Sequence, residues 1–384
     1  MKGKTLRVLA SLAVIGVLMV VSVIIYMRQP MFGSLPDGDR LARIERSPNY
    51  ANGQFRNQVP TPIKTTEQSE LSMWAQTLFG EKGQPRPVGS IPSIKTDLKA
   101  INPRDDVVVW LGHSSYFVQL DGQRILIDPV FSENAAPVPL ANMAFAGTSI
   151  YTAEDMPEID VLLISHDHYD HLDYPSIQAL KSKVRQVVVG LGVGAHFQVW
   201  GYDPSLVHEA DWNETVEVAP TLKIDVTPAR HFSGRTFDRD RSLWVSFVVT
   251  SSNRRLFFSG DTGYGSHFSE IGRRFGPFDW VALDMGQYDP RWANVHMNPE
   301  QAAQAAEDLN TRVLMPTHVG KFSLSPHDWD EPFRRITAAS RGRAYALWTP
   351  QIGRSVFLDG RQQSFTAWWE GNPHNQIAAQ AQGE

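Results

Sequence analysis

His166-Asp167-His168-Tyr169-Asp170-His171 is the most informative stretch of this 384-residue sequence. Three imidazoles and the Asp170 carboxylate lie close together in it, and nitrogen and oxygen ligands of this kind suit zinc or a similar divalent ion. The apolar run 159–164 precedes the stretch, and residues 173–175 (Asp-Tyr-Pro) form a helix-start signal after it. The sequence therefore predicts a metal-binding loop at the carboxyl end of a buried strand, where open α/β sheets place their sites.

Three further candidate ligands follow apolar runs elsewhere in the chain. His231 comes after the alternating run 222–226, Asp261 after 256–258 and His318 after 313–315. We expect all three at the same sheet edge as the first stretch, and together they supply enough groups for two ions that share one bridging carboxylate. The candidate metal ligands are His166, His168, Asp170, His171, His231, Asp261 and His318.

The pattern from residue 107 onwards predicts an α/β layered fold. Strands are expected at 107–111, 115–120, 124–128, 243–250 and 255–259, and helices at 174–182 and 299–309. Asp128 and Asp261 close similar hairpins, which indicates a two-fold internal repeat. Strands that alternate with helices are typical of layered α/β proteins.

Composition narrows the classes of partner. The net charge is −5 and no long basic run occurs, which argues against nucleic acid as the main partner. The sequence contains no cysteine, so it has neither disulfides nor thiolate ligands. Its apolar content is ample for a large core.

The N-terminus predicts a membrane anchor. Residues 8–27 carry no charge, and at about 1.5 Å per residue they span about 30 Å, one bilayer core. The run ends at Arg28 without a small-residue cleavage site, which favours an uncleaved anchor over a signal peptide. Lys2, Lys4 and Arg7 precede it, so the N-terminus is expected in the cytoplasm. In a Gram-negative bacterium this places a single-pass protein in the inner membrane, with its bulk on the periplasmic side.

These observations divide the chain into four parts. Residues 1–28 are the expected anchor, and 29–100, which are rich in proline, glycine and polar groups, are a linker and arm. The main domain is expected at 101–370, with a disordered tail at 371–384. Helical spacing of apolar residues at 71–79 predicts one short helix in the arm.

Five stretches carry a family resemblance. They are 110–115 (Trp-Leu-Gly-His-Ser-Ser), 127–132 (Ile-Asp-Pro-Val-Phe-Ser), 163–173, 258–264 (Phe-Ser-Gly-Asp-Thr-Gly-Tyr) and 295–300 (Val-His-Met-Asn-Pro-Glu). With the ligand order His-x-His-x-Asp-His and then His, Asp and His, the chain resembles the metallo-β-lactamase superfamily. Within that superfamily it is similar to bacterial relatives of N-acyl-phosphatidylethanolamine-hydrolysing phospholipase D. The resemblance covers about residues 100–350 and implies a four-layer αββα sandwich.

The resemblance also implies how the ligands divide. One ion would take His166, His168 and His231, the second would take Asp170, His171 and His318, and Asp261 would bridge them. The absence of cysteine, together with a histidine rather than a carboxylate at position 168, favours a hydrolase with two Zn²⁺, although another divalent metal can fill such a site.

The implied reaction is hydrolysis of a phosphodiester by a metal-bridged hydroxide. Asp170 is expected to be a ligand that also orients the hydroxide. His113 is expected to fix a ligand by hydrogen bonding, and His296 to contact the phosphate or protonate the leaving group. The expected substrate is a phospholipid or N-acyl phospholipid. The alternatives are a zinc lactonase or soluble phosphodiesterase, and a non-catalytic zinc-binding scaffold.

Overall fold

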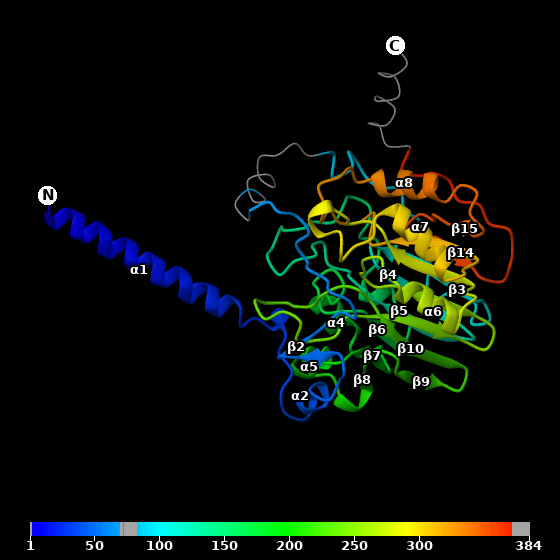
Figure 1. Cartoon of the computed structure of the whole chain (residues 1–384), viewed down its shortest axis with the longest axis horizontal. Helices are drawn as coiled ribbons and strands as arrows, with labels where there is room; N and C mark the ends of the chain where they lie inside the picture. Colours follow the sequence, from blue (N-terminus) through cyan, green and yellow to red (C-terminus); the bar gives the residue numbers. More distant parts are fainter. Residues whose placement is uncertain (1, 70–71, 73–82, 371–384) are drawn as a thin grey trace, which may run out of the picture.

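The computed structural model describes residues 2–69, 72 and 83–370. Most of the predicted helix at 71–79 and all of the predicted tail at 371–384 lie outside the described residues. The body of the protein is built on two large sheets, and one long helix extends away from it (Figure 1).

Within the described residues, each large sheet has seven strands. The first sheet has the order β16-β3-β4-β5-β6-β7-β8. Its strands are β3 (Val107–Gly112), β4 (Ser115–Leu120), β5 (Gln123–Ile127), β6 (Val161–Ile164), β7 (Val187–Gly190), β8 (Val207–Ala210) and β16 (Ser355–Phe357). The second sheet has the order β15-β14-β13-β12-β11-β10-β9. Its strands are β9 (Thr215–Ala219), β10 (Leu222–Pro228), β11 (Val245–Thr250), β12 (Arg255–Phe258), β13 (Trp280–Asp284), β14 (Val313–Thr317) and β15 (Ala346–Leu347).

The two sheets follow one pattern. In each, an antiparallel meander of three strands (β3-β4-β5 and β10-β11-β12) continues into parallel strands. This matches the predicted internal repeat. Because parallel strands end at the same edge, the loops after β6, β12 and β14 can converge, although they come from both sheets.

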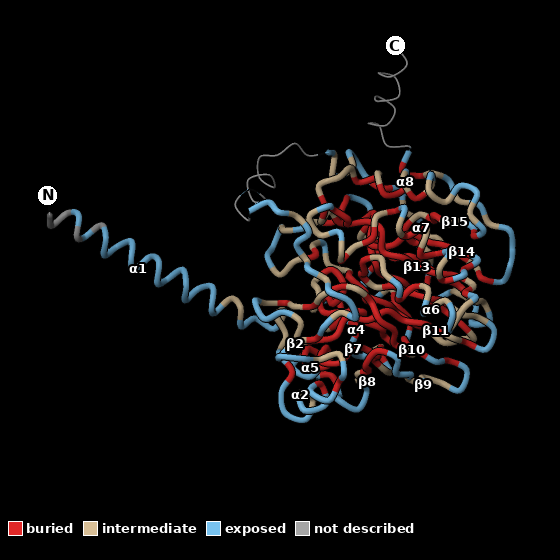
Figure 2. The backbone as a smooth tube through the Cα atoms, in the orientation of Figure 1, coloured by how far each residue is buried: buried red, intermediate tan, exposed pale blue. Residues whose placement is uncertain are grey.

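Helices cover the outer faces of the two sheets. These are α4 (Tyr174–Leu180) and α5 (Gly194–Val199) on the first sheet, and α6 (His267–Phe275), α7 (Pro299–Asp308) and α8 (Glu331–Ala339) on the second. Alternate residues of β3 show the layering, since Val107 and Val109 belong to the core with α4 and α5, whereas Val108 and Trp110 belong to the core between the sheets. The predicted αββα sandwich is confirmed, and Figure 2 shows its buried interior.

Local sequence sets where the helices begin. Asp173 caps α4 by accepting a hydrogen bond from the Ser176 amide, and Pro175 occupies the first turn. Asn298 and Gln301 form a capping box at the start of α7. The predicted helices at 174–182 and 299–309 therefore start at the observed residues.

The N-terminal segment consists of α1 (Lys2–Tyr26), α2 (Gly38–Ile44) and the hairpin of β1 (Tyr50–Ala51) and β2 (Gln54–Phe55). Within α1, Leu9–Tyr26 is long and apolar enough to cross a membrane by length and composition, and it is not buried against the body. Residues that follow the hairpin contact the second half of the chain, as when the Thr65 amide donates to Arg291 O at 2.9 Å. The predicted domain boundaries stay a prediction.

Candidate metal centre

The predicted ligands meet where strands of both sheets end. His166 follows β6, Asp261 follows β12, His318 follows β14 and His231 follows β10. The backbone joins the two sheets at this edge, because the Val245 amide donates to Ser165 O at 2.9 Å. The site therefore lies across the seam of the sandwich.

Four side chains form the first group: His166, His168, His231 and Asp261. Their ligand atoms all lie within 4.8 Å of one another. His168 Nδ1 is 2.8 Å from His166 Nε2 and 3.3 Å from His231 Nε2. Asp261 Oδ2 is 3.7 Å from Nε2 of both His166 and His231. Three imidazole nitrogens and one carboxylate oxygen thus converge on one small volume.

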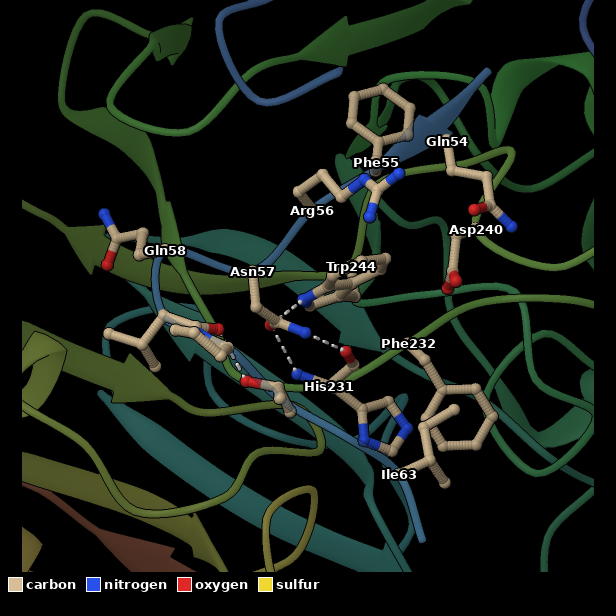
Figure 3. A pocket seen from close by; sticks show the side chains of 13 residues that line it. Gln54, Phe55, Arg56, Asn57, Gln58, Ile63, His231, Phe232, Asp240 and Trp244 are labelled. Carbon is tan, nitrogen blue, oxygen red and sulfur yellow. Dashed lines mark hydrogen bonds between the residues drawn. The ribbon is translucent and has the colours of Figure 1, made fainter. Parts of the chain in front are cut away.

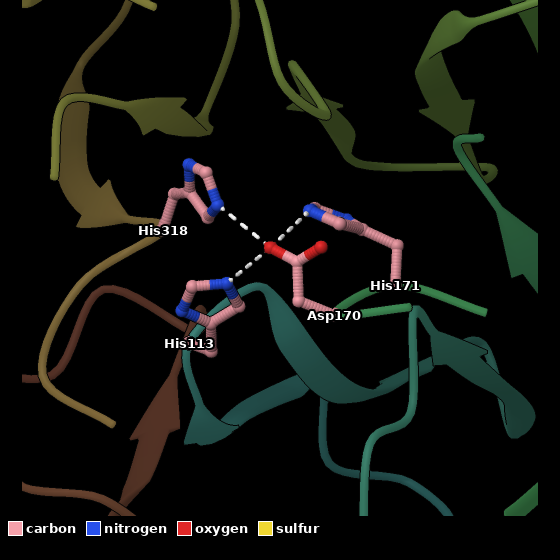
Figure 4. Close-up of side chains that lie close together, drawn as sticks. All are labelled: His113, Asp170, His171 and His318. Atoms are coloured by element: carbon pink, nitrogen blue, oxygen red, sulfur yellow. Dashed lines mark hydrogen bonds and ion pairs between the residues drawn. The ribbon is translucent and has the colours of Figure 1, made fainter. Parts of the chain in front are cut away.

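The second group comprises His113, Asp170, His171 and His318, again within 4.8 Å (Figure 4). Asp170 Oδ2 lies 2.9 Å from His113 Nε2, 3.1 Å from His318 Nε2 and 3.5 Å from His171 Nε2. Asp261 Oδ1 lies 3.1 Å from His171 Nε2 and 3.2 Å from His318 Nδ1. The two oxygens of Asp261 therefore face different groups, as a bridging carboxylate requires.

Hydrogen bonds leave the right ring nitrogens available for a metal. His231 Nδ1 donates to Val295 O at 3.0 Å, which makes Nε2 the nitrogen that carries the lone pair. His171 Nδ1 faces Asp128 Oδ2 at 2.8 Å in the same way. His171 Nε2 and Asp261 Oδ1 are buried and have no hydrogen-bond partner. Two buried polar atoms without hydrogen-bond partners, 3.1 Å apart, fit as neighbouring ligands of one divalent cation that lies about 2.0–2.2 Å from each.

Burial and neighbouring charges shift the pKa values of most proposed ligands in the direction that metal binding needs, and those of two histidines in the opposite direction. Burial, reinforced by His171, holds the pKa of His166 well below its usual value, so this imidazole is neutral and able to bind. Burial also lowers the pKa of His231. Burial opposes ionisation of Asp170, but His171 and hydrogen bonds outweigh it and hold the pKa well below its usual range. Burial lowers the pKa of His171 and His318, but Asp261 and the other carboxylates beside them outweigh it and raise both pKa values, that of His318 to about 10. These two rings therefore release a proton when they bind a metal, whereas His166 and His231 are already neutral.

Asp128 is linked by hydrogen bonds to a histidine of each ligand group. Its Oδ2 accepts from the Ser165 hydroxyl at 2.6 Å as well as from His171, and its Oδ1 accepts from the Ser165 amide at 2.8 Å. The Ser165 oxygen also lies 3.0 Å from His166 Nδ1. One carboxylate therefore fixes the ring orientation of a histidine in each group.

The structure places the other two predicted site residues beside the ligands. His113 is buried with φ 54°, and its ring lies 4.3 Å from the ring of His318. The hydrogen bond between His113 Nε2 and Asp170 Oδ2 would fix the direction of the Asp170 carboxylate. His296 is half-buried, and its ring centre lies 5.0 Å from those of His231 and His318.

Sequence reasoning missed Asp284. This fully buried carboxylate places Oδ1 3.1 Å from His318 Nδ1 and Oδ2 2.8 Å from His296 Nδ1, and it also accepts from the Thr262 amide at 3.1 Å. It ends the apolar run of β13, so the signal that singled out Asp261 and His318 was present here too.

Asn57 was also missed, and no local pattern marks it. Its side chain brackets the backbone of His231, because Nδ2 donates to His231 O at 2.7 Å and Oδ1 accepts from the His231 amide at 3.1 Å. Trp244 Nε1 also donates to Asn57 Oδ1, at 3.0 Å (Figure 3). A cavity of about 450 Å³ lies here, between residues 54–63 of the arm and the His231–Phe232 side of the centre. The arm is therefore part of the site's wall.

Comparison with known proteins places these features in a family. The family model described as a beta-lactamase superfamily domain matches residues 123–319. A protein of Mycobacterium tuberculosis is 36% identical over 329 residues, which cover 85% of this chain and 88% of that protein. N-acyl-phosphatidylethanolamine-hydrolyzing phospholipase D 1 of Caenorhabditis elegans is 33% identical over 237 residues, 57% of this chain and 65% of that protein. A solved metallo hydrolase from Ignicoccus hospitalis has a similar fold, with a TM-score of 0.51 at 23% identity over 68% of this chain and 99% of that one.

Proposed function

The chain belongs to the beta-lactamase superfamily and is a metal-dependent hydrolase, and from that premise we propose that it is a membrane-anchored dinuclear zinc phosphodiesterase of the phospholipase D type. The proposed substrate is a phospholipid or an N-acyl phospholipid. The observation that carries the proposal is the position of Asp261 between two groups of ligands.

The donor set supports two zinc ions. His166, His168 and His231 would hold one ion, and Asp170, His171 and His318 would hold the other, with Asp261 shared. Imidazole and carboxylate donors suit zinc, and the chain offers no thiolate. When bound, two such ions supply the acidity that lowers the pKa of water towards about 7, and they neutralise phosphate charge.

The surrounding residues have separate roles in the proposed reaction. His113 holds Asp170 by its contact with Oδ2, so this carboxylate keeps a fixed direction in the site. Asp284 accepts from Nδ1 of His296 and would stabilise the imidazolium form of this ring, whose Nε2–H can donate to a phosphate or leaving oxygen. The arm, through Asn57, holds the backbone of His231, so this ligand keeps its position beside the cavity.

Two observations support a lipid substrate. The relative from Caenorhabditis elegans carries the name of an enzyme that hydrolyses N-acyl-phosphatidylethanolamine. The apolar helix α1 would hold the centre close to a bilayer, and Arg7 before the span favours the cytoplasm for its N-terminus. We therefore propose a single-pass inner-membrane protein with its catalytic body outside the cytoplasm.

The test is release of phosphatidic acid from N-acyl-phosphatidylethanolamine by the purified full chain in vesicles. We expect product together with two zinc ions per chain by elemental analysis. His168→Ala should lower activity by more than about 100-fold, since even residues that only orient a ligand cost about 10–100-fold. His208→Ala, a histidine on β8 outside the ligand groups, is the matched control and should change neither reading.

The same assay separates the alternatives. Hydrolysis of small soluble phosphodiesters or lactones that equals or exceeds lipid turnover, with no dependence on vesicles or micelles, would replace the lipid assignment with a soluble substrate. Full zinc loading without hydrolysis of any of these substrates would favour a binding role instead.

A further inference from the structure

Two exposed loops meet the end of α1 where the apolar span stops. The Tyr26 hydroxyl, on the last residue of the helix, donates to Pro137 O at 2.6 Å. A cavity of about 270 Å³ separates the next residues, Met27 and Phe32, from the loop that follows β10. We name these the 134–143 loop and the 232–241 loop, and in Figure 1 the loop between β10 and β11 points towards the end of α1.

The tips of both loops carry unusually exposed apolar side chains. Phe237 is 87% exposed and Leu140 is 83% exposed, more than any other large apolar side chain among the described residues, those of α1 included. Val138 beside Leu140 is also exposed. A soluble surface scatters such residues singly, whereas here they gather beside a candidate membrane span.

Backbone geometry holds the 134–143 loop in this shape. Leu140 has φ 66° and Asn142 has φ 49°, left-handed conformations that side chains other than glycine rarely adopt. The Ala135 amide donates to Asn142 O at 3.1 Å and the Ala141 amide to Val138 O at 3.2 Å. The loop has no charged residue between positions 134 and 143. The exposure of Leu140 is thus fixed by a closed, uncharged turn.

We propose that the 134–143 and 232–241 loops form a collar that enters the bilayer interface around the exit of α1. The inference rests on the proposed anchor. If Leu9–Tyr26 spans the bilayer, Tyr26 lies at the level of the headgroups, where aromatic rings prefer to lie. The hydrogen bond from Tyr26 to Pro137 then sets the first loop at the same level. In the 232–241 loop, Phe237 is followed by the exposed pair Asp238 and Arg239. An apolar tip with charged neighbours suits the boundary between headgroups and acyl chains rather than the bilayer interior.

The collar is joined directly to the metal centre. Arg235, buried in the second loop, donates to Asp167 O at 2.7 Å, inside the ligand stretch, and to Leu172 O at 2.8 Å, directly after it. The same guanidinium donates through Nη2 to Met31 O at 2.6 Å, just beyond the anchor. Contact of the collar with lipid would therefore fix the orientation of the metal centre relative to the leaflet from which α1 emerges.

The absence of cysteine makes a depth measurement direct. Leu140→Cys and Phe237→Cys, each made in the full chain, are labelled with an environment-sensitive fluorophore and reconstituted in phosphatidylcholine vesicles. Val17→Cys within α1 marks the bilayer interior, and Asn253→Cys, exposed on the turn between β11 and β12, marks water. We expect quenchers carried on lipid chains to reduce fluorescence at 140, 237 and 17 at least two-fold more than at 253.

Each outcome decides the proposal. If the labels at positions 140 and 237 are as accessible to water as the label at position 253, while the label at position 17 lies in lipid, the collar is contradicted and the anchor is not. Loops that bind a protein partner instead of lipid would give this result. A water-accessible label at 17 would overturn both the anchor and the collar.

Activity supplies the second reading. The double variant L140S/F237S should hydrolyse vesicle-embedded substrate at least five-fold more slowly than the natural chain. Its turnover rate on a water-soluble phosphodiester should be unchanged. Equal loss on both substrates, or loss on neither, would contradict the collar. Absence of activity in the unmodified chain would concern the proposed function alone, since the depth measurement does not need turnover.

Discussion

Asp284 shows how a single buried carboxylate can link a proposed metal ligand, His318, to a second histidine, His296. One of its oxygens orients His318 and the other orients His296. A carboxylate behind a histidine fixes the ring and raises the basicity of the metal-binding nitrogen. Asp284 therefore contacts both a proposed ligand and the proposed donor, and with Asp261, His296 and His318 it forms a third group whose ligand atoms lie within 4.8 Å of one another.

We predict that Asp284→Asn lowers zinc affinity or activity by about 10–100-fold, because the amide keeps the shape of the side chain and loses its charge. The effect should include weaker retention of one of two zinc ions, measured by competition with a chelator. Asp225→Asn, on β10 and bonded to the Thr215 hydroxyl, is the control. Unchanged zinc retention in Asp284→Asn would contradict the assigned role.

Lys321 gives a prediction about pH. It is fully buried, donates to Val130 O at 2.6 Å, and burial lowers its pKa to about 8. The unfolded chain keeps a lysine pKa of about 10.4, so between these values the unfolded state binds more protons and the free energy of unfolding rises with pH. Below pH 8 the lysine is charged in both states, and the cost of burying that charge is fully present.

The measurement compares the unfolding free energies of the natural chain and Lys321→Met from pH 7 to pH 10. We expect the difference to shift in favour of the natural chain by about 2–3 kcal/mol over this range, because only the lysine carries the linkage. Both proteins keep the metal centre, so its contribution to the pH dependence of the unfolding free energy is the same in each and cancels in the difference. A difference independent of pH would show that the lysine titrates normally.

At the level of single residues, the sequence predicted groups that follow apolar runs. His231, Asp261 and His318 were proposed as ligands because a strand ending in a polar residue is a local pattern, and the same rule would have singled out Asp284. Asn57 could not be found in this way, since its role depends on contacts with His231 and Trp244, about 170–190 positions away along the chain. Only the fold brings those residues together.

At the scale of elements, the N-terminal arm is the least expected feature. The arm was predicted as a linker because its proline and glycine content hides any period, and α2 and the β1–β2 hairpin are too short to show one. Strands such as β6 and helices such as α7 were predicted well because apolar runs and capping residues are local signals. The arm acquires its order from the body on which it lies.

The arm's contribution can be measured through Asn57. We expect Asn57→Ala to lower the free energy of unfolding by about 1–3 kcal/mol, because the backbone of His231 loses two partners in a partly buried place. It should also weaken zinc retention, since that backbone positions a ligand. Gln58→Ala, exposed at the next position, is the control. Equal stability of the two variants in thermal melts would show that the arm does not support the centre.

At the scale of the whole molecule, the centre lies where two similar halves meet. His166 belongs to the first sheet and Asp261 and His318 to the second, so a bound metal would join the halves as well as serve catalysis. The resemblance predicted the αββα layering correctly because the metal motif is specific to one fold, whereas composition and periodicity alone indicated only an α/β protein.

Metal removal should therefore destabilise the whole body. Dialysis against a chelator should lower the melting temperature, and zinc should restore it, because a ligand that binds only the folded state adds about 4 kcal/mol at 1,000 times its Kd. His168→Ala should show a smaller drop on chelation than the natural chain. Identical melting with and without chelator would contradict a role for metal in joining the sheets.

The way α1 leaves the body has a kinetic consequence under the proposed function. A catalyst tethered in this manner searches a plane rather than a volume, so its encounters depend on how many substrate molecules share its own membrane patch. Dilution with inert lipid at constant total substrate would slow it, while dilution with buffer would not. The rate therefore depends on the mole fraction of substrate in the leaflet that the enzyme faces, and not on the substrate concentration in the whole solution.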